Sequence, residues 1–193
     1  MNSHYGAAGG FSSAVVGKTL IFSGEIEDNF LAFLWENLLK KGADLWDKKA
    51  EKAREDRRLI LNSTGGTAEC AFSAVDLFEH VSHLTTVATG ACMSGSIIVV
   101  AAGTPGCRFA TPRTRFMVHS PYWDLDSGTR RHTEVKVKEL KRIETVYAEI
   151  LEKYTKKPKA FWMAKQRVDE GYFFDAEEAR SLGIVDGIIK APY

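Results

Sequence analysis

The chain has almost no net charge, few cysteines and no long apolar run. Its 26 basic and 25 acidic residues nearly cancel, so no global electrostatic field draws it to nucleic acid or to an anionic membrane surface. No apolar run approaches the roughly 18 residues that a membrane span needs. Residues 1–17 contain no basic segment followed by a long apolar core, so they do not resemble a secretion signal. We therefore expect a cytoplasmic protein that binds neither nucleic acid nor membrane.

The cysteines and histidines give no sign of a metal centre. Cys70, Cys92 and Cys107 are an odd number without metal-type spacing, which is typical of free thiols in a reducing compartment. His80 and His83 could share one face of a helix, yet the sequence places no third ligand within their reach. We therefore predict no metal site and no cofactor.

The order of apolar patterns predicts the fold class. With 193 residues, of which 45% are hydrophobic, the chain can bury one sizeable core. Strand-like runs alternate with helical periodicity, without internal repeats, which is typical of an α/β fold built from parallel crossovers. We predict strands at 19–26, 58–61, 85–89 and 116–119, a final turn and strand at 183–189, and helices at 28–42, 68–83, 94–103, 133–154 and 176–180.

Two segments stand apart from this alternation. Residues 1–18 begin the chain with many small side chains, and we expect a flexible, solvent-exposed lead-in there, followed by a single domain at 19–193. The helix predicted at 133–154 carries an apolar stripe between charged residues. Its length indicates that it projects to meet another element or a second subunit. The stripe consists of Leu140, Ile143, Tyr147, Ile150 and Tyr154.

Ser94 and His119 are the candidate reactive pair. Ser94 lies among small residues where an apolar helix begins, and His119 ends a second apolar strand. A serine hydroxyl is a poor nucleophile at neutral pH unless a nearby base takes its proton, and histidine is the usual base. Ser94 is therefore a candidate nucleophile and His119 a candidate general base, although a lone histidine on an apolar strand is more often a structural residue than a base.

Two glycines are candidates for stabilising a negative oxygen. Backbone N–H groups at the start of a helix have no helical partner, so the N–H of Gly95 could hold an oxyanion beside Ser94. Gly66 follows a separate strand, where a chain without a Cβ can approach a substrate closely. Taken alone, the Gly65-Gly66 pair is more simply explained as a strand-to-helix turn. With Ser94 it predicts a two-part oxyanion hole.

The sequence excludes the α/β-hydrolase fold. That fold uses a G-x-S-x-G elbow, and here Cys92 and Ser96 occupy the glycine positions. Its triad also ends with histidine, whereas every histidine of this chain precedes residue 133.

Several motifs in order resemble the ClpP family, the proteolytic subunits of ATP-dependent Clp proteases. The likeness runs from residue 19 to the C-terminus. It rests on five motifs: L-I-F-S-G-E-I-E-D at 20–28, L-N-S-T-G-G at 61–66, the serine segment at 90–94 with 101–103, R-F-M-V-H-S-P at 115–121, and the C-terminal segments 176–179 and 183–186. In the second motif Thr64 replaces the usual proline.

The resemblance implies a fold and an assembly. The fold would be the ClpP/crotonase-like repeated β-β-α superhelix, and helix 133–154 would be the protruding handle that joins two heptameric rings into a stacked homo-oligomer. It also implies an AAA+ unfoldase as partner, although residues 1–17 do not resemble the segment that docks it.

The same resemblance implies the roles of individual residues. It places the family's catalytic serine on Ser94 and its base on His119. Counted back from 176–179 without a gap, the position of the triad's aspartate is filled by Gly171, and Asp169 or Glu170 lies just upstream. We predict Asp169, or alternatively Glu170, as the acid that orients the imidazole.

These features predict a serine endopeptidase of a self-compartmentalising ring protease, which cleaves unfolded polypeptides or short peptides. Two alternatives remain open. A crotonase-like acyl-CoA enzyme would share the superhelix and the glycine-rich loops, but it would stabilise an enolate without a serine–histidine pair. A non-catalytic or weakly active ring paralogue is suggested by Gly171 at the acid position.

Overall fold

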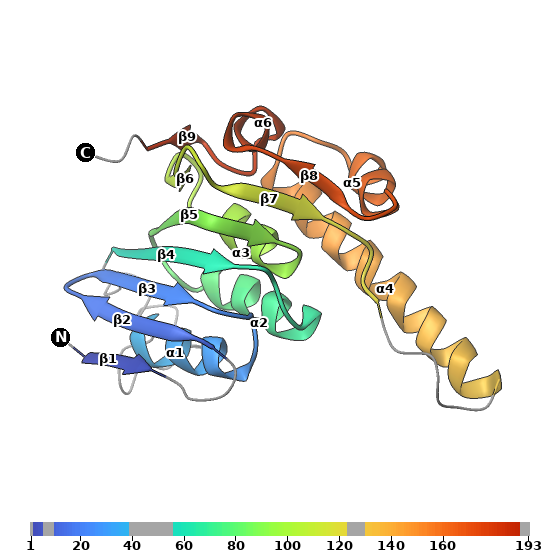
Figure 1. Cartoon of the computed structure of the whole chain (residues 1–193), viewed down its shortest axis with the longest axis horizontal. Helices are drawn as coiled ribbons and strands as arrows, with labels where there is room; N and C mark the ends of the chain where they lie inside the picture. The colour runs from blue at the N-terminus through green and yellow to red at the C-terminus, as the bar shows by residue number, and fades with distance from the viewer. Residues whose placement is uncertain (1, 6–9, 39–55, 123–129, 190–193) are drawn as a thin grey trace.

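The protein is described by a computed structural model over residues 2–5, 10–38, 56–122 and 130–189. Within these residues nine strands form one sheet, in the order β1-β2-β3-β4-β5-β6-β9, with β7 beside β5 and β8 beside β7 (Figure 1). The strands are β1 Asn2–Tyr5, β2 Ser12–Val16, β3 Thr19–Ser23, β4 Arg57–Ser63, β5 Leu84–Met93, β6 Arg108–Ala110, β7 Arg115–Val118, β8 Tyr172–Phe174 and β9 Gly187–Ile188. The helices are α1 Asp28–Leu38, α2 Ala68–Phe78, α3 Gly95–Ala101, α4 Arg130–Tyr154, α5 Lys159–Gln166 and α6 Ala176–Leu182.

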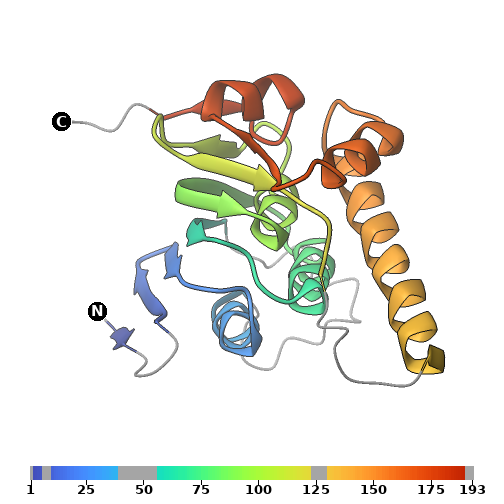
Figure 2. The same ribbon diagram turned by 45° about the vertical axis from the view of Figure 1, so that its right-hand side comes forward.

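The centre of the molecule is a parallel sheet covered by helices. Strands β3, β4, β5 and β6 run parallel, and Figure 2 shows α1, α2 and α3 together on one side of this sheet. Every residue of α3 is buried, as expected for a short helix that is apolar on all faces. The core therefore lies between the parallel strands and these helices.

The start of the chain differs from the predicted lead-in at 1–18. Within that range, Asn2–Tyr5 and Ser12–Val16 are antiparallel strands, and Ser12–Val16 pairs with Thr19–Ser23. The reason is a tight hairpin, in which Gly17 and Lys18 join two β-rich runs. Gly17 has a φ of 59°, and glycine suits the positive φ that such turns need. The sheet thus begins before residue 19. The predicted end of the first helix, Gly42, lies outside the described residues.

Strand β5 is longer than predicted and changes partner along its length. Residues Thr86–Ala88 pair with β6, whereas Ala91–Met93 pair with β7. Gly90 lies between the two halves with φ of 60°, and the N–H of Ala91 donates to Asn62 Oδ1 at 2.9 Å. Glycine thus bends the strand without ending it, and the second half carries the chain to Ser94.

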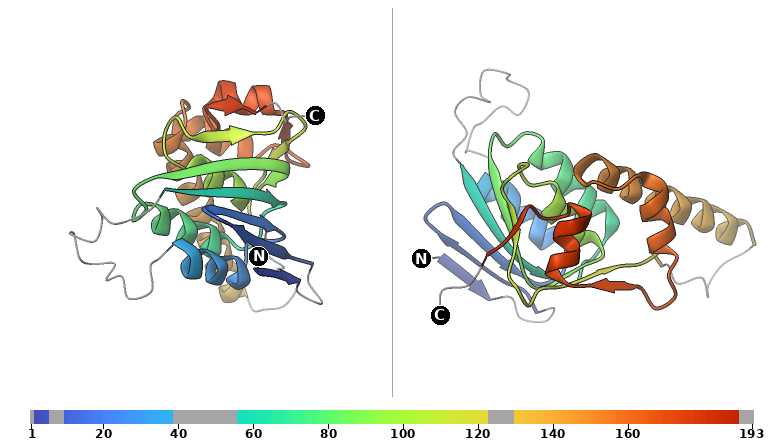
Figure 3. Two further views of the ribbon diagram at one scale, coloured as in Figure 1. Left: turned by 90° about the vertical axis from the view of Figure 1, so that its left-hand side faces the viewer. Right: turned by 90° about the horizontal axis from the view of Figure 1, so that it is seen from above.

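Helix α4 is packed along only part of its length. It begins at Arg130, slightly before the predicted 133, and its buried side chains are Ile143, Tyr147, Ala148 and Leu151. Residues 130–142 contain no buried side chain, and this half projects away from the sheet (Figure 3). None of the helices in the described part of the chain is long and apolar enough to cross a membrane.

Candidate active site

Ser94 occupies a sharp turn between β5 and α3. Its φ of 53° and ψ of −127° lie in a region that residues other than glycine rarely adopt, and such strain persists only where the surroundings fix it. The N–H of Ser94 donates to the carbonyl of Met117 at 2.8 Å. Its own carbonyl accepts hydrogen bonds from Tyr147 Oη at 2.9 Å and from the N–H of Ile97 at 3.1 Å. Three contacts therefore hold this backbone.

The turn is of the strand-to-helix kind found in nucleophile elbows, even though the glycines of that motif are absent. Ser96 replaces the second glycine and is completely buried. Its hydroxyl donates to the carbonyl of Met93 at 2.7 Å. The missing glycines argue against the α/β-hydrolase fold, but they do not prevent this local backbone conformation. Ser96 fits in the place of the second glycine because its hydroxyl is hydrogen-bonded within the turn.

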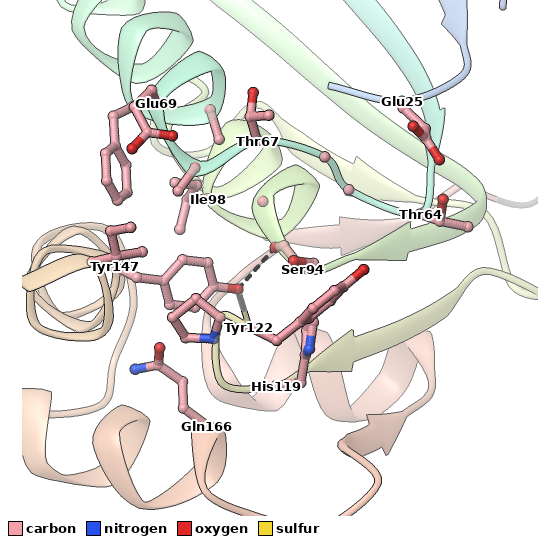
Figure 4. A pocket seen from close by; sticks show the side chains of 18 of the residues that line it. Glu25, Thr64, Thr67, Glu69, Ser94, Ile98, His119, Tyr122, Tyr147 and Gln166 are labelled. Atoms are coloured by element: carbon pink, nitrogen blue, oxygen red, sulfur yellow. Dashed lines mark hydrogen bonds between the residues drawn. The ribbon is translucent and has the colours of Figure 1, made fainter. Parts of the chain in front are cut away.

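His119 leaves the strand next to that of Ser94. Strands β5 and β7 are parallel and pair Met93 with Met117, so Ser94 and His119 both follow the same ends of neighbouring strands. Both side chains line one cavity of about 750 Å³ (Figure 4). No hydrogen bond joins Ser94 Oγ to the imidazole among the interactions of the described residues.

Burial sets the protonation of His119. The side chain is half-buried, and this desolvation lowers its pKa below the ordinary 6.5 because water no longer stabilises the charged form. The ring of Tyr122 lies 6.0 Å from the imidazole, centroid to centroid. His119 is therefore neutral near pH 7, which is the state that a general base requires.

Neither predicted acid contributes to the pKa of His119, whose shift has desolvation as its cause. Asp169 and Glu170 are both exposed, and neither lines the cavity. Glu170 and Gly171 have consecutive positive φ values of 62° and 91°. A Cβ at Gly171 would lie 3.0 Å from Met117 Sδ, so a side chain at this position would be strained by the positive φ and would require the Met117 side chain to shift.

The glycine loop after β4 passes directly beside Ser94. A Cβ at Gly65 would lie 2.6 Å from Ser94 Cβ and 2.8 Å from the carbonyl of Met93. Ile26 holds the loop from the other side, because its N–H donates to the carbonyl of Gly65 at 2.7 Å. The φ of 106° at Gly65 is also one that favours glycine. Both the contact and the conformation therefore require glycine at this position.

The two predicted oxyanion donors face the same space. Gly66 and Gly95 line the cavity together with Ser94 and His119. No acceptor for the N–H of either glycine occurs among the backbone hydrogen bonds of the described residues. The cavity thus brings four predicted site residues together, and the predicted acids do not line it.

One residue of the site is not predicted as such from the sequence. Tyr147 belongs to the apolar stripe of α4, yet its hydroxyl reaches Ser94 and its side chain lines the cavity. A buried tyrosine hydroxyl usually has a hydrogen-bond partner, so a tyrosine within an apolar stripe is a signal that some polar partner exists. The sequence does not say which one.

Among the described residues, no group of three or more histidine, cysteine, aspartate or glutamate side chains could hold a metal ion.

Comparison with known proteins agrees with this architecture. The family model described as Clp protease matches residues 18–192. Among solved structures, the chain is similar to a point mutant of ClpP1 from Listeria monocytogenes, with a TM-score of 0.75 and 23% sequence identity, over 90% of this chain and 92% of that one. The α/β, ClpP-like fold class and the family resemblance predicted from the sequence are thereby confirmed.

Proposed function

Because the chain belongs to the Clp protease family, we propose that it is a serine endopeptidase that cleaves unfolded polypeptides or short peptides. Family membership itself points to peptide or polypeptide substrates and to an oligomeric assembly. The observation that supports the finer assignment is the gathering of Ser94, His119, Gly66 and Gly95 around one cavity. This set contains a nucleophile, a neutral base and two backbone donors, which together suit acyl transfer.

The chemistry follows from these positions. Ser94 Oγ attacks the carbonyl carbon of the scissile peptide while His119 takes the hydroxyl proton. The negative oxygen of the tetrahedral intermediate is held by the N–H groups of Gly66 and Gly95. When the C–N bond breaks, His119 returns the proton to the leaving amine, and an acyl-serine remains. Water, deprotonated by His119, then attacks the ester and regenerates Ser94.

The second candidate is a weakly active or non-catalytic ring subunit. It is supported by the exposure of Asp169 and Glu170 and by a pKa of His119 that burial alone shifts. In a serine protease, neutralising the acid that orients the histidine lowers turnover about 10⁴-fold. A peptidase that works without this acid would therefore be slow.

The assembly proposed is a cytoplasmic homo-oligomer of two stacked heptameric rings in which the projecting half of α4 joins the rings. Support comes from residues 130–142 of α4, which carry no buried side chain, and from family membership. Rings stacked in this way enclose the cavities in a chamber, so entry to the chamber selects the substrate. We also propose that an AAA+ unfoldase feeds this chamber, and family membership is the support for this partner.

A labelling experiment tests the peptidase. Purified wild type is treated with a fluorophosphonate probe and, separately, assayed with short fluorogenic peptides. We expect labelling at Ser94 and cleavage in wild type, and neither in Ser94→Ala. Ser181→Ala removes an exposed serine whose hydroxyl bonds only its own helix, and this control variant should behave like wild type.

The same experiment separates the alternatives. If wild type cleaves no peptide and Ser94→Ala is indistinguishable from it, the chain is a non-catalytic ring subunit. If wild type turns over acyl-CoA thioesters without being labelled, it is a crotonase-like enzyme.

A further inference from the structure

The peptide bond between Ser94 and Gly95 carries two groups of the candidate site. Its carbonyl belongs to Ser94, and its N–H is the predicted oxyanion donor of Gly95. A trans peptide is planar, with its C=O and N–H pointing in opposite directions. Whatever fixes the direction of the Ser94 carbonyl therefore also fixes the direction of the Gly95 N–H.

Tyr147 is the side chain that holds this carbonyl. Its hydroxyl donates to the carbonyl oxygen of Ser94 at 2.9 Å, as the dashed line in Figure 4 shows. The tyrosine comes from the packed half of α4 and is 8% exposed. Burial raises its pKa well above 10.0, so the phenol keeps its proton and remains a donor across the pH range in which proteins work.

The other bond to this carbonyl is weaker as a constraint. The N–H of Ile97 donates to it at 3.1 Å, but Ile97 is only three residues away and belongs to the helix that begins at Gly95, so this bond does not tie the carbonyl to a separate element. The backbone at Ser94 is strained. Rotation of the peptide plane would relieve the strain, turn the Gly95 N–H away from the cavity and present a carbonyl to the oxyanion. A bond from a separate, buried element opposes that rotation.

We propose that Tyr147 is a positioning residue of the oxyanion hole, which orients the Gly95 N–H by holding the Ser94 carbonyl. This inference rests on the proposed peptidase function. The same hydrogen bond polarises the peptide group, so the Gly95 N–H becomes a stronger donor. Tyr147 thus acts on the transition state through a peptide plane and does not touch the substrate carbonyl itself.

Tyr147→Phe tests the proposal, since it removes one oxygen and keeps the ring. Because an oxyanion donor would be misoriented but not lost, kcat for a short peptide should fall about 10- to 100-fold while KM changes by less than about twofold. Affinity for a peptide boronic acid, whose tetrahedral adduct places an oxygen in the hole, should fall by a similar factor. Binding of the uncleaved peptide, measured in a Ser94→Ala background, should stay unchanged.

Tyr154→Phe is the matched control. Tyr154 lies on the same helix, and its hydroxyl bonds Glu79 at 3.2 Å outside the cavity. We expect wild-type kcat and boronate affinity for this variant. Equal losses in both variants would indicate a general weakening of α4 and overturn the proposal. Unchanged kcat and boronate affinity in Tyr147→Phe would overturn it as well.

A second replacement covers the case in which Tyr147→Phe does not fold. Substituting 3-fluorotyrosine at position 147 retains the hydroxyl, so wild-type kcat is expected, and a loss of activity in a folded protein overturns the assignment. The proposed function fails separately. If wild type and Ser94→Ala are equally inactive, the peptidase assignment falls and the role of Tyr147 falls with it. If Ser94→Ala is inactive and Tyr147→Phe equals wild type, only the role of Tyr147 falls.

Discussion

Ser94 and His119 obtain their chemistry from the backbone and the solvent around them. Ser94 is held at a φ of 53° by bonds from β7 and α4, and a residue kept in such a region costs about 1–3 kcal/mol. His119 is kept neutral by burial alone among the described residues. The strained backbone at Ser94 therefore lowers folding stability while fixing the position of a hydroxyl, and desolvation keeps the proposed base, His119, neutral.

Activity should persist to a lower pH than an ordinary histidine would allow. Because burial lowers the pKa of His119 below 6.5, its neutral form survives as the pH falls, and kcat/KM should decline only at a midpoint below 6.5. The measurement is a pH profile of kcat/KM with a short peptide, together with a check that the oligomer persists over the same range. A midpoint above 6.5 would contradict this prediction and would indicate that a carboxylate stabilises the imidazolium.

The sequence predicts the residues that carry a local signal and misses those that depend on tertiary contacts. Ser94, Gly95 and Gly66 each lie in a strand-to-helix segment with small neighbours, so their places could be predicted. The contact of Tyr147 with Ser94 spans 53 residues and leaves no pattern in the chain. The directions of the Asp169 and Glu170 side chains depend on a turn with two positive φ values, which an ungapped sequence comparison cannot trace.

At the level of elements, the glycine loop after β4 and the β5–α3 turn form one packed unit. We expect Gly65→Ala to abolish peptide cleavage and to destabilise the fold by about 1–3 kcal/mol, because the new Cβ would force Ser94 to move and alanine is strained at this φ. Cleavage assays and urea denaturation measure the two effects.

Gly106→Ala is the matched control for the loop. Gly106 has a similar φ of 86°, but no atom lies within 4 Å of its Cβ position. This variant carries the backbone strain without the contact, so it should lose stability and retain cleavage. If Gly65→Ala cleaves peptides as well as Gly106→Ala does, the close contact between the loop and Ser94 is not needed for cleavage.

Elements with their own periodicity could be predicted, whereas elements held by pairing could not. The stripe of α4 gives its extent within a few residues. Strand β5 continues past the predicted 89 because Asn62 binds the chain just beyond Gly90. Strand β8, with three residues, is too short for any pattern and exists through its pairing with β7.

For the whole molecule, one buried cation joins three elements and the turn before β9. Arg108 of β6 pairs with Asp186 at 2.6 Å, and its Nη1 donates to the carbonyls of Ala101 and Tyr154 at the ends of α3 and α4. Burial alone would raise the pKa of Asp186, but the hydrogen bonds and charge of Arg108 outweigh it and hold the pKa below 3.8.

This network predicts a stability difference that depends on pH. At pH 7, Asp186→Asn should be less stable than wild type by about 3 kcal/mol, because it leaves the buried guanidinium without its counter-charge. A lowered carboxyl pKa contributes stability above the unfolded-state value and loses it as the pH falls through the folded-state value. The difference should therefore shrink below pH 3.8.

Urea denaturation at fixed protein concentration, at pH 7 and pH 3, measures this difference. Glu177→Gln is the control, since Glu177 and Arg180 form an exposed pair, and such pairs contribute about 0–1 kcal/mol. A difference between Asp186→Asn and wild type that stays constant with pH would mean that the carboxylate charge is not what stabilises this network.

The projecting half of α4 offers a test of the proposed stacking of two rings. Val135 is 62% exposed, so Val135→Asp should leave the subunit folded but place a charge in the proposed contact, where burial of an unpaired charge is costly. Light scattering should then report a single ring in place of two. Val168→Asp makes the same change outside α4, at a residue that is 42% exposed, and should keep the wild-type mass. If both variants keep that mass, α4 does not join the rings.

Because β5 pairs with β6 in its first half and with β7 in its second half, the stability of the candidate site and the stability of the whole fold can differ. The strands of the serine and the histidine are joined by three residue pairs, Ala91–Arg115, Cys92–Phe116 and Met93–Met117. Beyond Gly90, β4 adds only the pair Ser63–Cys92, whereas the first half of β5 pairs with β4 at five positions and with β6 at three. Local opening beyond Gly90 would therefore separate Ser94 from His119 and abolish the proposed activity, while calorimetry would still register an intact fold.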